Sequence, residues 1–378
     1  MLFIKLPKSR CEILRKRLSK MDLLISNVKP LRYDDYIAFP VKESIKDVED
    51  PEIKSLELLD IDSYEAMDLT KGSFKDYLKR YLNEEELKHI SNGYDIYGSI
   101  AVIDIDNSLK DKAKLIAKAL MDFDKRIKTV LAKKSAVSGA YRTREFSYIY
   151  GRRSYIAEHK ENGCIFRYDI RKVFFSNRLA FERKRVYSLV KDHERVYVMF
   201  SGVAPFSIEI AKHTNADKIL SAELNPYGHR YAIINCRLNN ISYIDLDSKI
   251  DNRSLEAALS SKERMILINA NVSDLSNLEA IDSYFDRIVM PLPRSTLLFL
   301  NEAYKAARDN ATVHLYAFSD INNPFESIKR RILEHAEANG YKIEFLFERV
   351  VRNYSPQELE VVIDYRIIKN KKLLQDVK

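Results

Sequence analysis

Gly202 and Glu223 have the residue types and the spacing of a nucleoside-binding site. Gly202 follows the apolar run 195–200, and Glu223 ends a second apolar run 21 residues later. In a strand–helix–strand unit that binds a nucleotide, the ligand approaches the backbone at a glycine turn. An acidic side chain at about this distance then reaches the ribose hydroxyls. The pattern therefore predicts a site for an adenosine.

The same stretch argues against a dinucleotide or a nucleoside triphosphate as the ligand. Gly202 stands alone where a dinucleotide fingerprint needs three glycines, and the sequence around it has no P-loop lysine. A nucleoside without phosphates fits better, which suggests S-adenosylmethionine as the cofactor. From this stretch alone, an ordinary strand–helix–strand crossover with an incidental glutamate remains an alternative.

Alternating strands and helices after residue 176 would position this site. Besides 195–200 and 219–224, apolar runs predict strands at 265–270, 285–290, 312–318, 343–351 and 360–367. Helices are expected from Pro205 and at 226–239, 295–308 and 324–339, and we interpret the polar stretch 245–263 as an insertion. The last two strands can pair around 354–356. This order predicts an α/β fold, a doubly wound and mostly parallel sheet with an antiparallel edge hairpin.

The composition fits a chain of two or three domains that uses neither metals nor disulfides. Its 378 residues exceed what one core supports, and 46% of them are hydrophobic. Cys11, Cys164 and Cys236 are isolated, so we expect neither a disulfide framework nor a metal site. Because no apolar run is long enough for a membrane span and the start has no signal-peptide order, we expect a cytoplasmic protein without a membrane partner.

A basic segment at residues 126–191 indicates a nucleic-acid partner. It holds seventeen Lys and Arg against five Asp and Glu, whereas the whole chain carries a net charge of only +8. Aromatic residues are interleaved with the cations, as on surfaces that neutralise phosphates and stack bases. The alternative is a solvated basic face whose aromatic side chains point into the core.

The part of the chain before residue 176 divides into three further regions. Residues 1–45 predict a small N-terminal α/β domain with strands at 2–6, 26–31 and 36–41 and a helix at 9–21. Residues 46–70 carry nine acidic and two basic side chains, so we interpret 46–72 as an acidic linker. Residues 73–175 predict an α+β platform that carries the basic surface.

The platform is expected to contain two helices and three strands. Asn83 and Glu86 predict a capping box for a helix that ends at Gly93. A strand at 94–105 and a helix at 108–131 follow, and strands at 140–150 and 154–175 are expected to pair across 151–153. The fourth region, 176–378, holds the doubly wound sheet.

The chain resembles the archaeal and eukaryotic tRNA (guanine-37-N1)-methyltransferases over nearly its whole length. The resemblance rests on HKENGCIFRYDIRKVFFSNRLAFERKRV (159–186), MFSGVAPFSIEIAK (199–212), AELNPYG (222–228) and DRIVMPLPRSTLLFL (286–300). It implies a Rossmann-like class I methyltransferase domain at 176–378. It also implies that 73–175 grips the anticodon stem-loop and that 1–45 touches the outer corner of the tRNA. We expect a monomer.

The resemblance also implies roles for single residues. Glu182 matches the general base that removes the N1 proton of guanine, and Arg142 matches the arginine that contacts the base, with Arg144 as the alternative. Phe174 matches an aromatic residue that stacks on the flipped-out base. The alternatives are a surface salt bridge of Glu182 with Arg178, Arg183 or Arg185, and core packing for Phe174. The substrate side is completed by Pro291, Pro293 and Arg294. The cofactor side comprises Arg178, Arg183, Phe200, Ser201, Gly202, Val203, Glu223, Leu224, Asn225, Asn271, Val272 and Pro291.

Two departures from the family pattern narrow the expected substrate. Glu223 replaces an aspartate at the ribose, and Pro291-Leu292-Pro293 replaces an Asn-Leu-Pro loop. In both features the chain resembles an archaeal subgroup whose members methylate C7 of 4-demethylwyosine in tRNA(Phe). Some members of this subgroup also make N1-methylguanosine. Two alternatives remain: an aminocarboxypropyl transferase of wyosine biosynthesis, and a tRNA-binding protein without catalytic activity.

Overall fold

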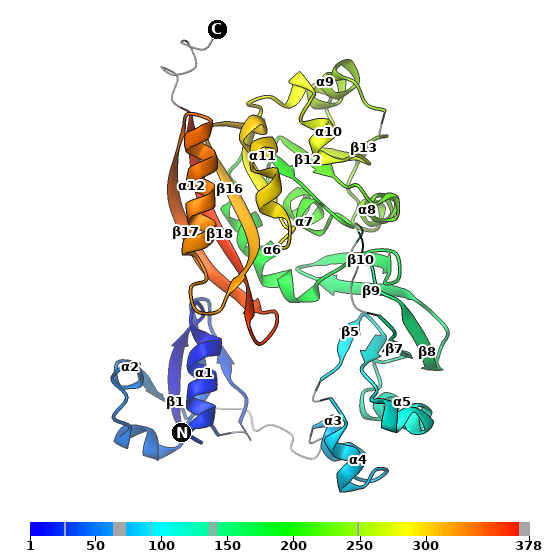
Figure 1. Ribbon diagram of the computed structural model, residues 1–378, viewed down its shortest axis with the longest axis vertical. Coiled ribbons are helices and arrows are strands. Elements are labelled where there is room, and N and C mark those ends of the chain that lie inside the picture. The colour runs from blue at the N-terminus through cyan, green and yellow to red at the C-terminus, as the bar shows by residue number, and fades with distance from the viewer. Residues whose placement is uncertain are drawn as a thin grey trace. The chain divides into compact units, whose positions relative to one another are not determined.

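The chain forms two compact units, Met1–Leu87 and Lys88–Lys378 (Figure 1). The computed structural model describes residues 1–25, 28–62, 73–91, 93–135, 139, 141, 143–247 and 249–369. None of the helices in these ranges combines the length and the apolar character that crossing a bilayer requires.

The first unit is built on an antiparallel sheet in the order β2-β3-β1-β4. Helix α1 (Cys11–Lys20) packs on this sheet through the buried side chains of Leu14 and Leu18. The predicted strands at 2–6 and 36–41 and the helix at 9–21 are therefore confirmed. Of the predicted strand at 26–31, only Leu31 lies in a strand among the described residues. The four strands are β1 (Leu2–Pro7), β2 (Leu31–Arg32), β3 (Tyr36–Pro40) and β4 (Leu58–Asp60).

The interpretation of residues 46–72 as a linker is wrong for residues 46–62. A 3-10 turn, η1 (Glu43–Asp47), and α2 (Pro51–Lys54) lead into β4, which pairs with β1. Apolar side chains alternate with the acidic ones, and Val48 and Ile53 are buried in the same core as α1. Residues 63–72 lie outside the described ranges.

Two short helices close the first unit, α3 (Phe74–Leu78) and α4 (Glu84–Lys88). The predicted capping box is confirmed. Asn83 Oδ1 accepts from the Glu86 N–H at 2.9 Å, and Glu86 Oε2 accepts from the Asn83 N–H at 3.1 Å. The helix ends at Lys88 rather than at Gly93. The boundary between the compact units lies at residue 87, later than the predicted start of the platform.

The second unit begins with a small α+β sheet in the order β5-β6-β7-β8. β6 and β7 are parallel and are connected by η3 and α5, whose buried residues include Leu109, Ile116 and Leu120. The elements are β5 (Asp95–Tyr97), β6 (Ile100–Ile103), η3 (Asn107–Lys112), α5 (Ala113–Phe123), β7 (Thr129–Lys133) and β8 (Phe146–Gly151).

Three predictions within this region are wrong in detail. The stretch 94–105 is a hairpin and not one strand, because Gly98 turns the chain with φ +58°. The predicted helix at 108–131 ends at Phe123, since Asp124 is extended and the apolar run after it forms β7. β8 pairs with β7, so the predicted hairpin across 151–153 does not form.

The stretch 154–175 is itself a hairpin of β9 (Ile156–Glu161) and β10 (Cys164–Asp169). Asn162 and Gly163 form the turn with φ +46° and +74°. An Asn-Gly pair favours this turn because both positions need a left-handed backbone. The hairpin packs on α8: Asn235 Oδ1 accepts from the Arg167 N–H at 2.7 Å, and Asn239 Oδ1 accepts from the Ile165 N–H at 2.9 Å.

The large sheet confirms the predicted α/β fold. Its strand order is β13-β14-β12-β11-β15-β16-β18-β17. Neighbours are parallel from β13 to β16, and β18 is antiparallel to both β16 and β17. The strands are β11 (Arg195–Val198), β12 (Lys218–Ala222), β13 (Tyr243–Leu246), β14 (Met265–Ile268), β15 (Phe285–Met290), β16 (Ala307–Asp320), β17 (Tyr341–Asn353) and β18 (Glu358–Lys369).

Helices cover both faces of this sheet (Figure 1). One face packs against Phe206 of α7 and Cys236 of α8. The other face packs against Leu255 of α9, Ala303 of α11 and Ile332 of α12. The helices and 3-10 turns are η4 (Asn177–Leu179), α6 (Ala180–Leu189), α7 (Pro205–His213), α8 (Pro226–Leu238), α9 (Asn252–Ser260), α10 (Val272–Leu275), η5 (Glu279–Ile281), η6 (Thr296–Phe299), α11 (Leu300–Ala306) and α12 (Glu326–Ala338).

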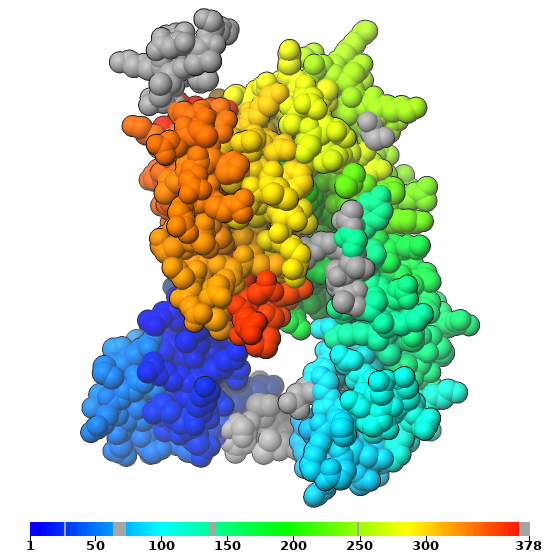
Figure 2. Space-filling model, viewed as in Figure 1, coloured from blue at the N-terminus to red at the C-terminus, as the bar shows by residue number. Residues whose placement is uncertain are grey.

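The interpretation of the polar stretch 245–263 as an insertion is wrong. It contains the end of β13 and all of α9, which Asp251 caps by accepting from the Ser254 N–H at 2.8 Å. Leu255 and Leu259 bury one side of α9. At the other edge of the sheet, the β17–β18 turn lies on the molecular surface, where it is drawn in red (Figure 2).

Candidate active site

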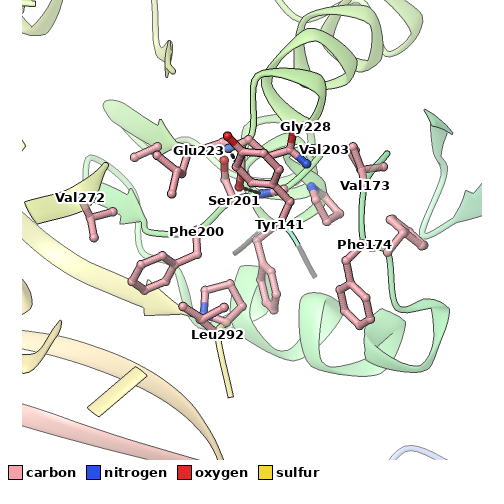
Figure 3. Close-up of a pocket in the computed structure, with 18 of the residues that line it drawn as sticks. Tyr141, Val173, Phe174, Phe200, Ser201, Val203, Glu223, Gly228, Val272 and Leu292 are labelled. Atoms are coloured by element: carbon pink, nitrogen blue, oxygen red, sulfur yellow. Dashed lines mark hydrogen bonds between the residues drawn. The ribbon is translucent and has the colours of Figure 1, made fainter. Parts of the chain in front are cut away.

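A cavity of about 360 Å³ lies at the carboxyl ends of β11, β12, β14 and β15. β11 has β12 on one side and β15 on the other, so the order of the sheet reverses here. In open α/β sheets, ligands bind at this switch point. Figure 3 shows Phe200 and Leu292 on one side of the cavity and Val173 and Phe174 on the other.

The loop between β11 and α7 holds a strained backbone against the cavity. Phe200, Gly202 and Ala204 have φ of +54°, +60° and +62°. Glycine adopts this left-handed conformation freely, whereas it costs about 1–2 kcal/mol for another residue. Pro205 then occupies the first turn of α7, where its missing N–H has no cost. Strain kept at two non-glycine positions is typical of a functional loop.

Glu223 fixes this loop. Its Oε2 accepts from the Gly202 N–H at 2.6 Å, and its Oε1 accepts from the Asn225 N–H at 2.7 Å. Burial raises the pKa of the Glu223 carboxyl, and these two N–H groups offset part of that rise. The predicted pair Gly202 and Glu223 is therefore joined directly, with room left on the carboxylate oxygens for hydroxyl donors.

Gly228 leaves room for the contact between Glu223 and the Gly202 loop. We did not predict this role for Gly228. A Cβ at residue 228 would lie 3.0 Å from Glu223 Cγ and 3.2 Å from the Gly202 carbonyl oxygen. Asn225 caps the same helix, α8, by accepting from the Tyr227 N–H at 3.0 Å. The AELNPYG segment thus supplies a carboxylate, a cap and a space for the loop.

The cavity beyond Glu223 is mostly apolar. Phe200 meets Phe299 edge-on, with ring centroids 4.8 Å apart. Asn271 lies three residues after the end of β14 and caps α10 by accepting from the Ser273 N–H at 3.1 Å. A flat aromatic ring between such walls, with an amide at its edge, is the arrangement that an adenine needs. Of the predicted cofactor residues, those lining the cavity are Arg183, Phe200, Ser201, Gly202, Val203, Glu223, Leu224, Asn225, Asn271, Val272 and Pro291.

Arg183 reaches the cavity from a buried cluster of charges. Its Nε lies 2.6 Å from Glu161 Oε1 and 3.4 Å from Glu209 Oε1. Its Nη2 donates to the Ser176 carbonyl at 2.9 Å, which fixes the segment that carries Phe174. Sequence reasoning missed Glu161 and Glu209, because both contacts cross between distant elements.

The two glutamates of this cluster differ in their protonation. Burial raises the pKa of Glu161, but the hydrogen bond from His159 and the charge of Arg183 bring it below its usual value. Burial raises the pKa of Glu209 to about 8, since the Arg183 charge does not compensate and the Glu161 carboxylate adds to the rise. At neutral pH the cluster therefore holds one carboxylate and one largely protonated carboxyl around a single guanidinium.

Glu182 does not line the cavity. It is fully buried, its Oε2 accepts from Arg185 Nε at 2.9 Å, and its Oε1 lies 2.8 Å from Arg349 Nη2. The Tyr316 hydroxyl donates to Oε2 at 3.0 Å. In this arrangement the carboxylate joins α6 to β16 and β17. Of the alternative, the Arg185 partner is confirmed, but the surface location is wrong, because the salt bridge is buried.

The predicted base-contacting residues are divided between two places. Phe174 lines the cavity and is 40% exposed, and Tyr141, which we did not predict, lies at the same opening. Arg144 lies in a small adjoining cavity of about 40 Å³ with Tyr97 and Tyr168. Arg142 lies outside the described ranges.

Three other predicted residues lie outside the cavity lining. Arg178 pairs with Asp95 at 3.1 Å. Pro293 is buried, and its carbonyl accepts from the Phe318 N–H at 3.0 Å. Arg294 is exposed at the outer side of the same loop.

Family models match most of the chain. A model described as the TRM5/TYW2 methyltransferase domain matches residues 157–272. Models described as the TYW2 N-terminal domain and the tRNA methyltransferase 5 N-terminal domain match residues 74–154 and 4–49.

The relatives of this chain include named tRNA methyltransferases. The chain is 32% identical to tRNA (guanine(37)-N(1))-methyltransferase Trm5b of Pyrococcus abyssi, over 97% of this chain and 99% of the relative. It is 32% identical to tRNA (guanine(37)-N(1))/4-demethylwyosine(37)-methyltransferase Taw22 of Nanoarchaeum equitans, over 63% of this chain and 88% of the relative. It is also similar to the solved complex of aTrm5 with tRNALeu, with a TM-score of 0.63 and 27% identity over 98% of this chain and 100% of that one.

Proposed function

This chain belongs to the TRM5/TYW2 methyltransferase family, and we propose that it transfers a methyl group from S-adenosylmethionine to the nucleotide at position 37 of tRNA. The observation that carries the proposal is the cavity at the switch point of the sheet, with Glu223 bonded to the Gly202 loop. The Arg183 guanidinium at the cavity is already paired with Glu161, so it is not free to bind a phosphate. The cavity presents the Glu223 carboxylate and apolar walls, which suit an uncharged nucleoside.

The cavity residues fit the proposed cofactor at each of its parts. The Glu223 carboxylate would accept hydrogen bonds from the two ribose hydroxyls, and Phe200, Val272 and Phe299 would enclose the adenine. The cofactor supplies an activated methyl group when bound. The protein is then left to align the acceptor base and to remove its proton.

The acceptor is N1 of guanosine and, we propose further, C7 of 4-demethylwyosine in tRNA(Phe). Pro291 and Leu292 line the cavity in place of a side-chain amide that would read the guanine edge. An apolar wall distinguishes poorly between two planar bases of different shape, because it leaves no buried donor unpaired when the base changes. Phe174 stacks on either base in this proposal, since every base has a π-face.

The proton acceptor for N1 methylation is a separate prediction. Glu182 keeps the role that the family resemblance implies, because it precedes the cavity residue Arg183 on α6. The Arg185 and Arg349 contacts must loosen before its carboxylate can take a proton. The stabilising cation for the base is Arg142 or Arg144.

The test is methyl incorporation into two tRNAs. The purified protein would be incubated with S-adenosylmethionine and tRNA(Phe) carrying either guanosine or the tricycle at position 37. We expect methylation of both. Methylation of guanosine alone would reject the dual substrate. A mass gain equal to an aminocarboxypropyl group would instead support aminocarboxypropyl transfer as the function. This activity is named in a relative, tRNA(Phe) (4-demethylwyosine(37)-C(7)) aminocarboxypropyltransferase, to which the chain is 26% identical.

The partner of the platform and of the first unit is the same tRNA in this proposal. We propose that residues 73–175 bind the anticodon stem-loop and that residues 1–45 bind the outer corner. The protein acts as a cytoplasmic monomer. Absence of cofactor binding by calorimetry would instead favour a tRNA-binding protein without catalytic activity.

A further inference from the structure

Next to the cavity lies a partly exposed group of cations and aromatic rings, which we name the arginine–aromatic cluster. It consists of the exposed Arg294 and Tyr354 and the half-buried Phe318 and Arg352. The Phe318 and Tyr354 ring centroids are 4.1 Å apart. The Arg294 Cζ lies 5.3 Å from the Phe318 centroid and 5.6 Å from the Tyr354 centroid. The Arg352 Cζ lies 5.6 Å from the Tyr354 centroid.

The cluster is held at the edge of the cavity by its backbone. The Phe318 N–H donates to the Pro293 carbonyl at 3.0 Å, which ties β16 to the Pro291–Pro293 loop. Pro291 and Ser295 line the cavity on either side of Arg294. Tyr354 comes from the β17–β18 turn, which lies on the surface in Figure 2 and is closed by the Tyr354 N–H donating to the Glu358 carbonyl at 2.9 Å.

The charges of the cluster are not neutralised equally. Arg352 pairs with the buried Glu360, with 2.5 Å between Nε and Oε2. Arg294 has no carboxylate within 4.0 Å among the described residues, and its only hydrogen bond there is a 3.5 Å contact with the Tyr354 hydroxyl. Tyr354 is 39% exposed. The Arg294 guanidinium therefore lies over two aromatic rings without a carboxylate partner among the described residues, and one of these rings, that of Tyr354, is exposed. Such an arrangement has no evident role in the core of the protein.

Further arginines lie close to the cluster. Burial and the Asp95 charge raise the pKa of Tyr97, whereas the charges of Arg144, Arg178 and Arg352 lower it. Three arginines from different elements therefore lie around one region beside the cavity, and Arg178 among them is paired with Asp95. Cations alone suggest a phosphate, but stacked rings in their midst suggest a nucleotide with its base turned toward the protein.

We propose that the arginine–aromatic cluster binds the nucleotide that flanks the target base, with its base stacked on Tyr354 and Arg294 and its phosphate near the Arg294 guanidinium. This rests on the proposed function, because a base that enters the cavity must leave its stack in the anticodon loop. Its neighbour then loses a stacking partner, and an exposed aromatic surface at the cavity edge restores one.

The experiment is a double-mutant cycle between the protein and the RNA. The full-length protein and its Tyr354→Ala and Tyr354→Phe variants would bind tRNA(Phe) transcripts that are intact or abasic at position 36 or at position 38. We expect Tyr354→Ala to weaken binding about tenfold, in line with one lost base–aromatic stack, and Tyr354→Phe to bind like the wild type. Abasic substitution at one of the two positions should weaken the wild type about as much, yet leave Tyr354→Ala no weaker than before.

Two outcomes overturn the proposal. The first is that Tyr354→Ala binds the intact tRNA as tightly as the wild type does. This result is also expected if the cluster binds a protein and not the tRNA. The second is that each abasic substitution weakens tRNA binding by the same factor in Tyr354→Ala as in the wild type. Cofactor affinity and methyl transfer by the wild type, measured in parallel, report on the proposed function by themselves, so failure of one proposal is distinguishable from failure of the other.

Discussion

Glu223 accepts the Gly202 N–H at 2.6 Å, so the acidic residue expected at the ribose also holds the loop that faces the ligand. One carboxylate connects the ends of β11 and β12 and also lines the cavity. Cofactor affinity should therefore depend on the charge of Glu223 and on its position.

The Glu223→Gln substitution tests the charge. Glutamine presents an amide N–H₂ to one of the two backbone N–H groups, so one hydrogen bond becomes a contact between donors. Hydrogen bonds to a charged group contribute roughly 1.5–3 kcal/mol, which corresponds to a loss of S-adenosylmethionine affinity of about ten- to a hundredfold. Isothermal titration calorimetry measures it. Affinity within twofold of the wild type would remove Glu223 from cofactor binding.

Gly228→Ala tests the position of Glu223 without changing its charge. The added Cβ would lie 3.0 Å from Glu223 Cγ, which is tighter than most Cβ contacts in proteins, so the Glu223 side chain must shift by a few tenths of an ångström. Alanine within α8 favours the helix by about 1 kcal/mol, and we therefore expect weaker cofactor binding without a matching fall in melting temperature. Gly93→Ala is the control, because a Cβ there meets nothing within 4 Å.

Glu182→Gln separates the two roles of Glu182. Its carboxylate pairs with Arg185 and Arg349 inside the protein, and breaking a buried pair costs roughly 3–5 kcal/mol, so the melting temperature should fall. If Glu182 also takes the N1 proton, turnover must collapse in the protein that remains folded, while tRNA affinity stays close to the wild type. Single-turnover methyl transfer at 25 °C measures this.

The control for Glu182→Gln is Asp364→Asn. Asp364 accepts from Arg185 at 2.5 Å and lies 2.8 Å from His314, so the variant disturbs the same network from β18. We expect a fall in melting temperature and near-normal turnover. Equal losses of turnover in both variants would show that Glu182 only supports the structure.

The buried Glu209 should make stability depend on pH. Burial raises its pKa from the usual 4.5 to about 8, so the folded protein binds this proton more tightly than the unfolded chain does. The stability that the protonated carboxyl contributes is complete below pH 4.5 and is lost as the pH rises toward 8. Glu209→Gln keeps the neutral form at every pH. As the pH rises from 5 to 8, the melting temperature of the wild type should therefore fall relative to that of Glu209→Gln.

Glu161→Gln is the matched variant to Glu209→Gln, because both glutamates lie next to the Arg183 guanidinium. Hydrogen bonding from His159 and the Arg183 charge lower the pKa of Glu161, so at neutral pH this substitution removes a charge that Glu209→Gln does not. We expect Glu161→Gln to be the more destabilising of the two at pH 7. A pH-independent difference between Glu209→Gln and the wild type would contradict the protonation that we assign to Glu209.

The sequence predicted contacts that are local or that follow from strand order. Gly202 and Glu223 are adjacent because parallel strands end at the same edge, and the Asn83 cap is decided by residues three positions apart. The β17–β18 hairpin and the doubly wound sheet were predictable for similar reasons. Composition was a poorer guide, since the acidic stretch that contains Ile53 and the polar stretch that contains Leu255 each bury a periodic apolar side.

Long-range partners could not be predicted in this way. Glu209 lies between apolar residues of α7, and only the fold shows that Arg183 from α6 and Asn162 from the β9–β10 turn meet it. The same holds for Glu182, whose partners come from β16 and β17. The Asn162–Gly163 turn is the exception, because its residue pair is a strong hairpin signal that the pairing predicted across 151–153 overlooked.

Pro291→Asn tests whether the missing amide broadens the choice of base. Pro291 lines the cavity next to Leu292, and an asparagine there would restore a side chain that donates to guanine and accepts from it. One hydrogen bond contributes about 1 kcal/mol, so kcat/KM for guanosine-37 relative to the tricycle should rise roughly fivefold. Pro291→Ala removes the proline without adding an amide and should leave this ratio near that of the wild type. The measurement is competition between the two tRNA(Phe) substrates in one reaction. A similar change of ratio in both variants would mean that the loop backbone, and not the amide, decides which base is accepted.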